Sequence, residues 1–134
     1  MSTIQNLWGE LPLAEAIRTP ASILQEQANQ LTELTKGILE GEVTKGKSQL
    51  TTRKNKPFIV RFNIIAPALD NYRYAVMRVY HDIVLYPLAV VDQVNGLEYE
   101  CEDEDNFINV VAQILSSTDV HKAIAALLSQ SKSD

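Results

Sequence analysis

The chain has 134 residues, of which 46% are hydrophobic and 22% charged, and its net charge is −5. These values are typical of one globular domain and exclude a fibrous or wholly disordered chain, so we predict a single domain over residues 1–134. The single cysteine, Cys101, excludes an intramolecular disulfide and a cysteine-based zinc site, and it favours a reducing compartment.

The sequence shows no targeting or membrane-spanning segment. The first ten residues lack the basic start and apolar core of a secretory signal. The longest apolar run, residues 83–91, is interrupted by Pro87 and is far shorter than the ~20 residues that a spanning helix needs. We therefore expect a cytoplasmic protein without a membrane partner.

The first predicted elements are helical. Residues 1–18 are rich in apolar side chains, and a short helix could begin at Pro12. Thr19 and Pro20 then form a cap followed by a proline suited to a first helical turn. Apolar residues recur at steps of three and four from Leu24 onward, which predicts an amphipathic helix over about 20–40 that ends at Gly41.

The next segment, residues 42–56, is polar and basic. It suits either a flexible linker or a weak edge hairpin, and we predict a loop with partial strand character. Strands are then predicted over 58–65, where apolar residues alternate, and over 72–80, which is rich in aromatic and β-branched residues. Residues 83–94 predict a further strand, in which Pro87 indicates a bulge or an edge position.

The clearest local signal is Asn95-Gly96, which predicts a two-residue hairpin turn. In the strand that follows, alternation places Leu97, Tyr99 and Cys101 toward the core and the intervening glutamates toward water. Residues 103–106 then open a helix, and residues 118 onward form a second one that Thr118 caps. Residues 130–134 are expected to fray.

These elements predict an α+β fold. We expect a four-stranded antiparallel sheet packed with one long N-terminal helix and two C-terminal helices on one face. No internal repeat or low-complexity tract is present.

Charge is distributed unevenly along the chain. Residues 1–42 hold six acids and two bases, residues 43–81 hold eight bases and one acid, and residues 82–134 hold ten acids and two bases. Such asymmetry indicates the partners of a protein rather than its fold. Acids concentrate in a predicted acidic ridge: Glu98, Glu100, Glu102, Asp103, Glu104 and Asp105. Bases concentrate in a predicted basic region: Lys45, Lys47, Arg53, Lys54, Lys56 and Arg61.

The candidates for catalysis are weak. His81-Asp82 resembles a metal dyad, but adjacent strand residues point to opposite faces and the other histidine lies on a different element. Asp92 with the glutamates of the following strand suits a metal-dependent hydrolase only poorly, since no lysine follows them. Cys101 lies on the inward face, where cysteine acts as a small hydrophobe. We find no nucleophile elbow, phosphate loop or dinucleotide motif, and we expect no metal or cofactor.

We therefore expect a non-enzymatic interaction module, of the inhibitor, immunity or assembly-subunit kind, whose acidic ridge binds a basic protein partner. The alternative is a nucleic-acid-binding or processing protein that uses the basic region between residues 45 and 78, where tyrosines are interleaved. A homo-oligomer through the helix at 20–40 and the Leu7-Trp8 segment also stays open. A metal-dependent hydrolase is the weakest reading.

Overall fold

The computed structural model describes residues 5–13, 17–47 and 56–132. Its elements in chain order are α1 (Pro20–Leu34), β1 (Glu40–Lys47), β2 (Phe58–Ala66), the short 3₁₀ helix η3 (Pro67–Leu69), β3 (Tyr72–His81), β4 (Leu88–Asp92), β5 (Glu98–Cys101), α2 (Glu104–Leu115) and α3 (Thr118–Ser131). The α+β class, with one antiparallel sheet and three helices, is confirmed. The predicted number of strands is wrong, because the sheet has five strands and not four.

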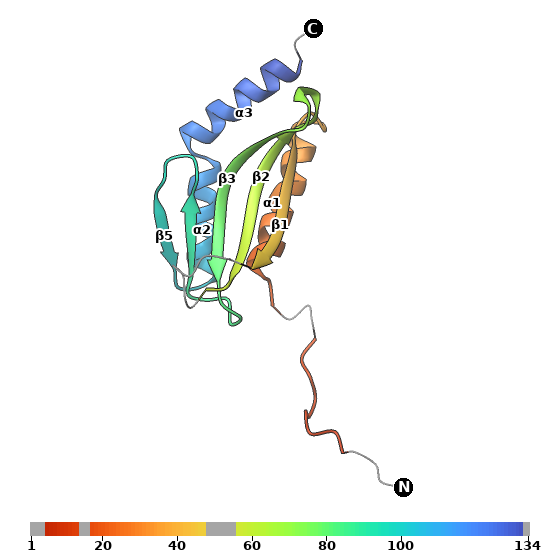
Figure 1. Ribbon diagram of the computed structural model, residues 1–134, viewed down its shortest axis with the longest axis vertical. Coiled ribbons are helices and arrows are strands. Elements are labelled where there is room, and N and C mark those ends of the chain that lie inside the picture. The colour runs from red at the N-terminus through yellow and green to blue at the C-terminus, as the bar shows by residue number, and fades with distance from the viewer. Residues whose placement is uncertain (1–4, 14–16, 48–55, 133–134) are drawn as a thin grey trace.

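The additional strand is β1, at the edge of a sheet whose order follows the chain from β1 to β5 (Figure 1). It pairs with β2 over its whole length, from Glu40 opposite Ile65 to Lys47 opposite Phe58. Residues 42–47 are therefore strand, whereas the prediction favoured a loop over 42–56. β1 has few apolar residues, so it lacks the alternation that reveals a strand, and its backbone bonds to β2 define it instead. Residues 48–55 lie outside the described ranges.

The first helix begins as predicted. The Thr19 side chain accepts a hydrogen bond of 3.1 Å from the backbone nitrogen of Ser22, and Pro20 occupies the first turn. This contact satisfies one of the free backbone N–H groups at the start of a helix. The residues before it are not helical over 5–13. Of the short helix predicted from Pro12, residues 12–13 and 17–18 are not helical, and residues 14–16 lie outside the described ranges.

The same helix ends at Leu34, earlier than the predicted end near residue 40. The Thr35 hydroxyl accepts a hydrogen bond of 3.1 Å from the Leu39 backbone nitrogen, and Lys36 takes a left-handed conformation with φ of 54°. A side-chain hydroxyl that binds nearby backbone groups competes with helical hydrogen bonds. The chain therefore turns here, and Gly41 lies in β1 rather than at the helix end.

β4 is shorter than the strand predicted over 83–94. Residues 82–87 form a loop in which Ile83 and Val84 are exposed, and the strand begins only after Pro87. The Asp82 side chain accepts a 2.7 Å hydrogen bond from the Ile83 nitrogen, which stabilises the turn. Proline cannot donate to a strand ladder, so the apolar character of residues 83–86 does not extend the sheet.

The turn around Asn95-Gly96 is longer than the predicted two residues, since residues 93–97 lie between β4 and β5. The Asp92 nitrogen donates to the Leu97 carbonyl oxygen at 2.8 Å and closes a loop around residues 93–96. The buried Asp92 carboxylate accepts from the Val94 nitrogen at 2.9 Å and holds this longer turn. Compared with a two-residue turn, the pairing of β4 with β5 is shifted by two residues, so each side chain stays on the predicted face of the sheet. Leu97, expected in the core, is 53% exposed because it lies at the turn.

The main core lies between the sheet and the helices α1 and α2, which cover one sheet face (Figure 1). It is built from fully buried side chains of all these layers, including Leu24, Phe62, Met77, Val90 and Phe107. A second, smaller cluster of Ile59, Tyr80 and Ala89 lies on the opposite face.

The C-terminal helices differ from the prediction in their arrangement. α2 begins as expected, with the Asp103 carboxylate accepting from the Asn106 nitrogen at 2.9 Å. Ser117, one residue before the predicted Thr118, caps α3. α3 contacts η3 and α2 and lies toward the end of the sheet where β2 turns into β3, instead of lying flat on the face (Figure 1). It continues through Ser131, and residues 133–134 of the predicted frayed tail lie outside the described ranges.

Candidate functional site

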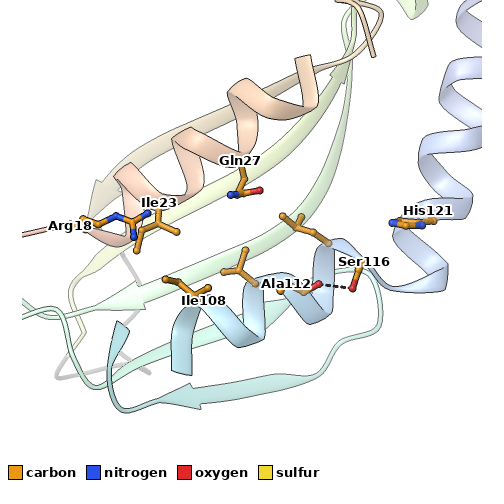
Figure 2. A pocket seen from close by; sticks show the side chains of 9 residues that line it. Arg18, Ile23, Gln27, Ile108, Ala112, Ser116 and His121 are labelled. Carbon is orange, nitrogen blue, oxygen red and sulfur yellow. Dashed lines mark hydrogen bonds between the residues drawn. The ribbon is translucent and has the colours of Figure 1, made fainter. Parts of the chain in front are cut away.

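An apolar groove separates α1 from α2 on the helix-covered face. α1 packs on β1 and β2, whereas α2 packs on β5, so the two helices cover different parts of one sheet. Figure 2 shows Ile23 and Gln27 of α1 pointing toward Ile108 and Ala112 of α2 across a cavity of about 380 Å³.

A second cavity of about 190 Å³ adjoins the first and extends it toward α3. Both cavities are lined by Gln27, Leu115 and His121, which makes them one continuous depression. Phe62 and Ile64 of β2 line the second cavity beside these side chains. We call the two cavities together the α1–α2 groove.

The walls of the α1–α2 groove offer mainly apolar contact. Leu34, at the end of α1, is 81% exposed and lines the second cavity, and Ala112 is exposed in the first. Its polar side chains away from the Arg18 end are Gln27, Gln30, Ser116 and His121. The Ser116 hydroxyl donates to the Ala112 carbonyl oxygen at 2.6 Å. A concave apolar surface with a few polar groups is the usual form of a binding site.

One end of the groove is charged. Arg18 lines it and forms ion pairs with Glu26 of α1 at 3.1 Å and with Glu104 of α2 at 3.6 Å. Asp103 and Asp105 stand beside Glu104 at the start of α2. Acids therefore outnumber bases at this end, where they also complement the positive end of the helix dipole.

The structure divides the predicted acidic ridge between two places. Glu98 and Glu100 lie on β5 opposite Val91 and Ala89, so they share the sheet face that carries the small Ile59 cluster. The other members, Glu102 to Asp105, lie at the junction of β5 and α2. Among these acids, Glu104 is brought to the α1–α2 groove by its ion pair with Arg18.

The described members of the predicted basic region also lie on different faces. They are Lys45, Lys47, Lys56 and Arg61, whereas Arg53 and Lys54 lie outside the described ranges. Lys45 lines a small depression with Thr19 and Ser22 on the α1 side of β1. Arg61 pairs in register with Thr44 and Arg78 on the opposite face. Nucleic-acid binding through this region stays a prediction.

A polar network that the sequence did not indicate joins β1, β2 and β3. Arg73 donates two hydrogen bonds to the Glu42 carboxylate, at 2.7 and 3.0 Å, and Asn63 donates a third at 3.0 Å. These donors, Arg73 first and Asn63 second, lower the pKa of Glu42 below its ordinary value. Arg73, counted among the bases of the chain middle, is therefore paired within the sheet.

The residues considered for catalysis have structural roles. The His81 ring stacks on Phe58 with 5.5 Å between ring centroids, and Asp82 holds the turn that follows. Cys101 is buried, and burial together with the nearby Asp103 carboxylate raises the pKa of its thiol to about 11. A thiol with this pKa stays protonated near neutral pH and is a poor nucleophile. Among the described residues, no group of three or more His, Cys, Asp or Glu side chains is arranged to hold a metal ion.

The N-terminal segment exposes large apolar side chains to solvent. Leu7 is 86% exposed and Trp8 is 81% exposed, and Leu11, Leu13 and Ile17 are also exposed. The segment extends away from the folded body (Figure 1). The apolar density of the first eighteen residues signalled this feature in the sequence, but the groove had no such signal, since its walls belong to the same helical stripes that form the core.

Comparison of the chain with protein-family models, curated protein sequences and solved structures finds no match. Over residues 5–13, 17–47 and 56–132, no helix combines the length and the apolar character needed to cross a membrane.

Proposed function

We propose that the chain is a non-enzymatic protein-interaction module that holds an apolar segment of a protein partner in the α1–α2 groove. The observation that carries this proposal is the continuity of two apolar cavities between α1, α2 and α3. The exposed Leu34 side chain adds apolar surface at one end of the second cavity. The acidic ridge contributes through the members at the start of α2.

The size of the groove suits a few anchoring side chains. Burial of one Leu, Ile or Phe side chain contributes ~1.5–3 kcal/mol, and a micromolar complex needs ~8 kcal/mol beyond the cost of ordering the partner. Cavities of about 380 and 190 Å³ accept two or three such anchors. We therefore expect a partner segment with several apolar side chains on one face.

The charges at one end of the groove indicate that the partner segment also carries a basic residue. Glu104 presents its carboxylate to Arg18, and Asp103 and Asp105 are its neighbours in the chain at the start of α2. A basic residue that follows the apolar anchors would meet these acids. Partly exposed charges of this kind mainly raise the association rate and select the orientation of the partner.

The test is affinity capture from the native lysate after nuclease treatment, with three forms of the tagged protein. Ala112→Arg places a long charged side chain in the first cavity, and Ala125→Arg adds the same side chain at an exposed position of α3 that lines neither cavity. We expect the wild type and Ala125→Arg to retain one stoichiometric protein partner and Ala112→Arg to lose it by roughly tenfold or more. Circular dichroism checks that both variants are folded.

Two results would contradict the proposal. One is a partner that binds Ala112→Arg as well as it binds Ala125→Arg, since the groove would then not be the contact surface. The other is recovery of nucleic acid without a protein partner when nuclease is omitted. That result would favour the basic region, and neutralisation of Lys56 and Arg61 would become the next experiment.

A further inference from the structure

We infer that a second copy of this chain occupies the α1–α2 groove, through the N-terminal arm formed by residues 5–13. In the resulting dimer each copy inserts its arm into the groove of the other. The inference rests on the proposed function, because it uses the same groove as a docking site. It adds the identity of one occupant.

The first observation is the character of the arm. Four large apolar side chains of the arm are exposed: Leu7, Trp8, Leu11 and Leu13. The largest of them, Trp8, is 81% exposed. Soluble proteins rarely leave so many large apolar side chains together in water unless another surface covers them. Glu10 is the single charged residue among residues 5–13, so covering the arm removes little charge from water.

The second observation is the direction and length of the arm. In Figure 1, residues 5–13 lie away from the body to which they belong, where a second molecule can contact them. The arm bends at Gly9, whose φ is 71°. Drawn out as a strand in the complex, the seven residues from Leu7 to Leu13 would span ~23 Å at 3.3 Å per residue. The 15 residues of α1, which form one wall, span ~22 Å. Arm and groove wall therefore match in length.

The exchange of arms is compatible with a symmetric dimer. An arm that leaves one copy and a groove that receives the arm of the other make a reciprocal pair about a two-fold axis, which is the commonest form of homodimer. Each dimer then buries two arms and fills two grooves. A partner segment that binds the groove has to displace the arm, so dimerisation and partner binding compete.

Trp8 provides the assay, because it is the only tryptophan in the chain. We would record the emission maximum of the purified full chain and its mass by sedimentation over a wide range of concentration. We expect a monomer with red-shifted emission at low concentration and a dimer with blue-shifted emission at high concentration, with the same midpoint for both signals.

Matched variants locate the contact. Ala112→Arg in the groove and Leu11→Asp in the arm should each move the midpoint to roughly tenfold higher concentration or beyond. The controls Ala125→Arg, on α3 outside the groove, and Gln5→Asp, which adds the same charge to the arm, should leave it unchanged. Both groove and arm are thus tested by changes at exposed positions that leave the core intact.

Three results would overturn the inference. A monomer with solvent-exposed Trp8 at every concentration excludes the dimer, and a dimer that Ala112→Arg does not weaken excludes the groove. Blue-shifted emission from a monomer at every concentration would place the arm on its own body. These results are separate from the lysate experiment. A partner that Ala112→Arg alone abolishes, seen with a strictly monomeric chain, would leave the proposed function standing while the inference fails.

Discussion

Gly41 of β1 lies directly against Ala28 of α1, and we expect Gly41→Ala to destabilise the fold. A Cβ atom at residue 41 would lie 2.5 Å from the Ala28 Cβ and 3.0 Å from its carbonyl oxygen. Ala28 is buried on α1, so the helix cannot yield without moving one wall of the α1–α2 groove. Overpacking of this kind costs ~1–3 kcal/mol.

The expected change in melting temperature follows from the size of the chain. An entropy of unfolding of ~2.1 cal/mol/K per residue amounts to ~0.28 kcal/mol/K for this chain. The cost of overpacking therefore corresponds to a melting temperature lowered by roughly 4–11 °C. Calorimetry measures this shift directly. Urea denaturation gives an independent value for the free energy of unfolding.

Gly46→Ala is the matched control, since it makes the same substitution in the same strand. Among the described residues, a Cβ at residue 46 would meet the end of the Ile59 side chain at 3.9 Å, an ordinary contact distance. We expect this variant to be neutral or slightly stabilised, because alanine restricts the unfolded chain more than glycine does. Equal stability of Gly41→Ala and Gly46→Ala would refute the reasoning. Adding Ala28→Gly should not rescue Gly41→Ala, since backbone atoms of residue 28 remain in contact.

Three further predictions concern the Glu42–Arg73 ion pair, the buried thiol of Cys101 and the cap of α2. Because Arg73 lowers the pKa of Glu42 below 4.5, the contribution of Glu42 to stability is present above that pH and lost as pH falls through the folded value. Urea denaturation at decreasing pH should therefore show that the difference in unfolding free energy between the wild type and Glu42→Gln becomes smaller. Cys101 should react with thiol reagents at neutral pH only as fast as the protein unfolds, and fast labelling would contradict its burial. Asp103→Ala should lose ~1 kcal/mol of unfolding free energy with the cap of α2, and Asp105→Ala distinctly less, as thermal melts can show.

The candidate site was less predictable than the elements that form it. The apolar stripes of α1 and α2 were visible in the sequence, but a stripe does not show which of its members contact the sheet and which line a gap. Ile108 is partly buried and lines the groove, whereas its neighbour Phe107 is fully buried in the core, and Ile23 belongs to the core and also lines the groove. The distance between two helices depends on where each packs along the sheet, and this is a property of the whole fold.

The sequence by itself determined the local structure wherever a short-range signal was strong. Thr19-Pro20 set the start of α1, the acids from Asp103 set the start of α2, and the alternation over 58–65 set β2. In each case the atoms that stabilise the element lie within a few residues of one another, so their spacing along the chain is sufficient.

Only the tertiary structure decided the features that join distant segments. β1 is a strand because β2 supplies its hydrogen bonds, although its own residues are polar. Arg73 belongs to an ion pair because the register of three strands brings Glu42 beside it. The α1–α2 groove exists because the two helices pack on different strands. Such contacts depend on chain positions tens of residues apart, and no local pattern of propensity or charge specifies which of them meet.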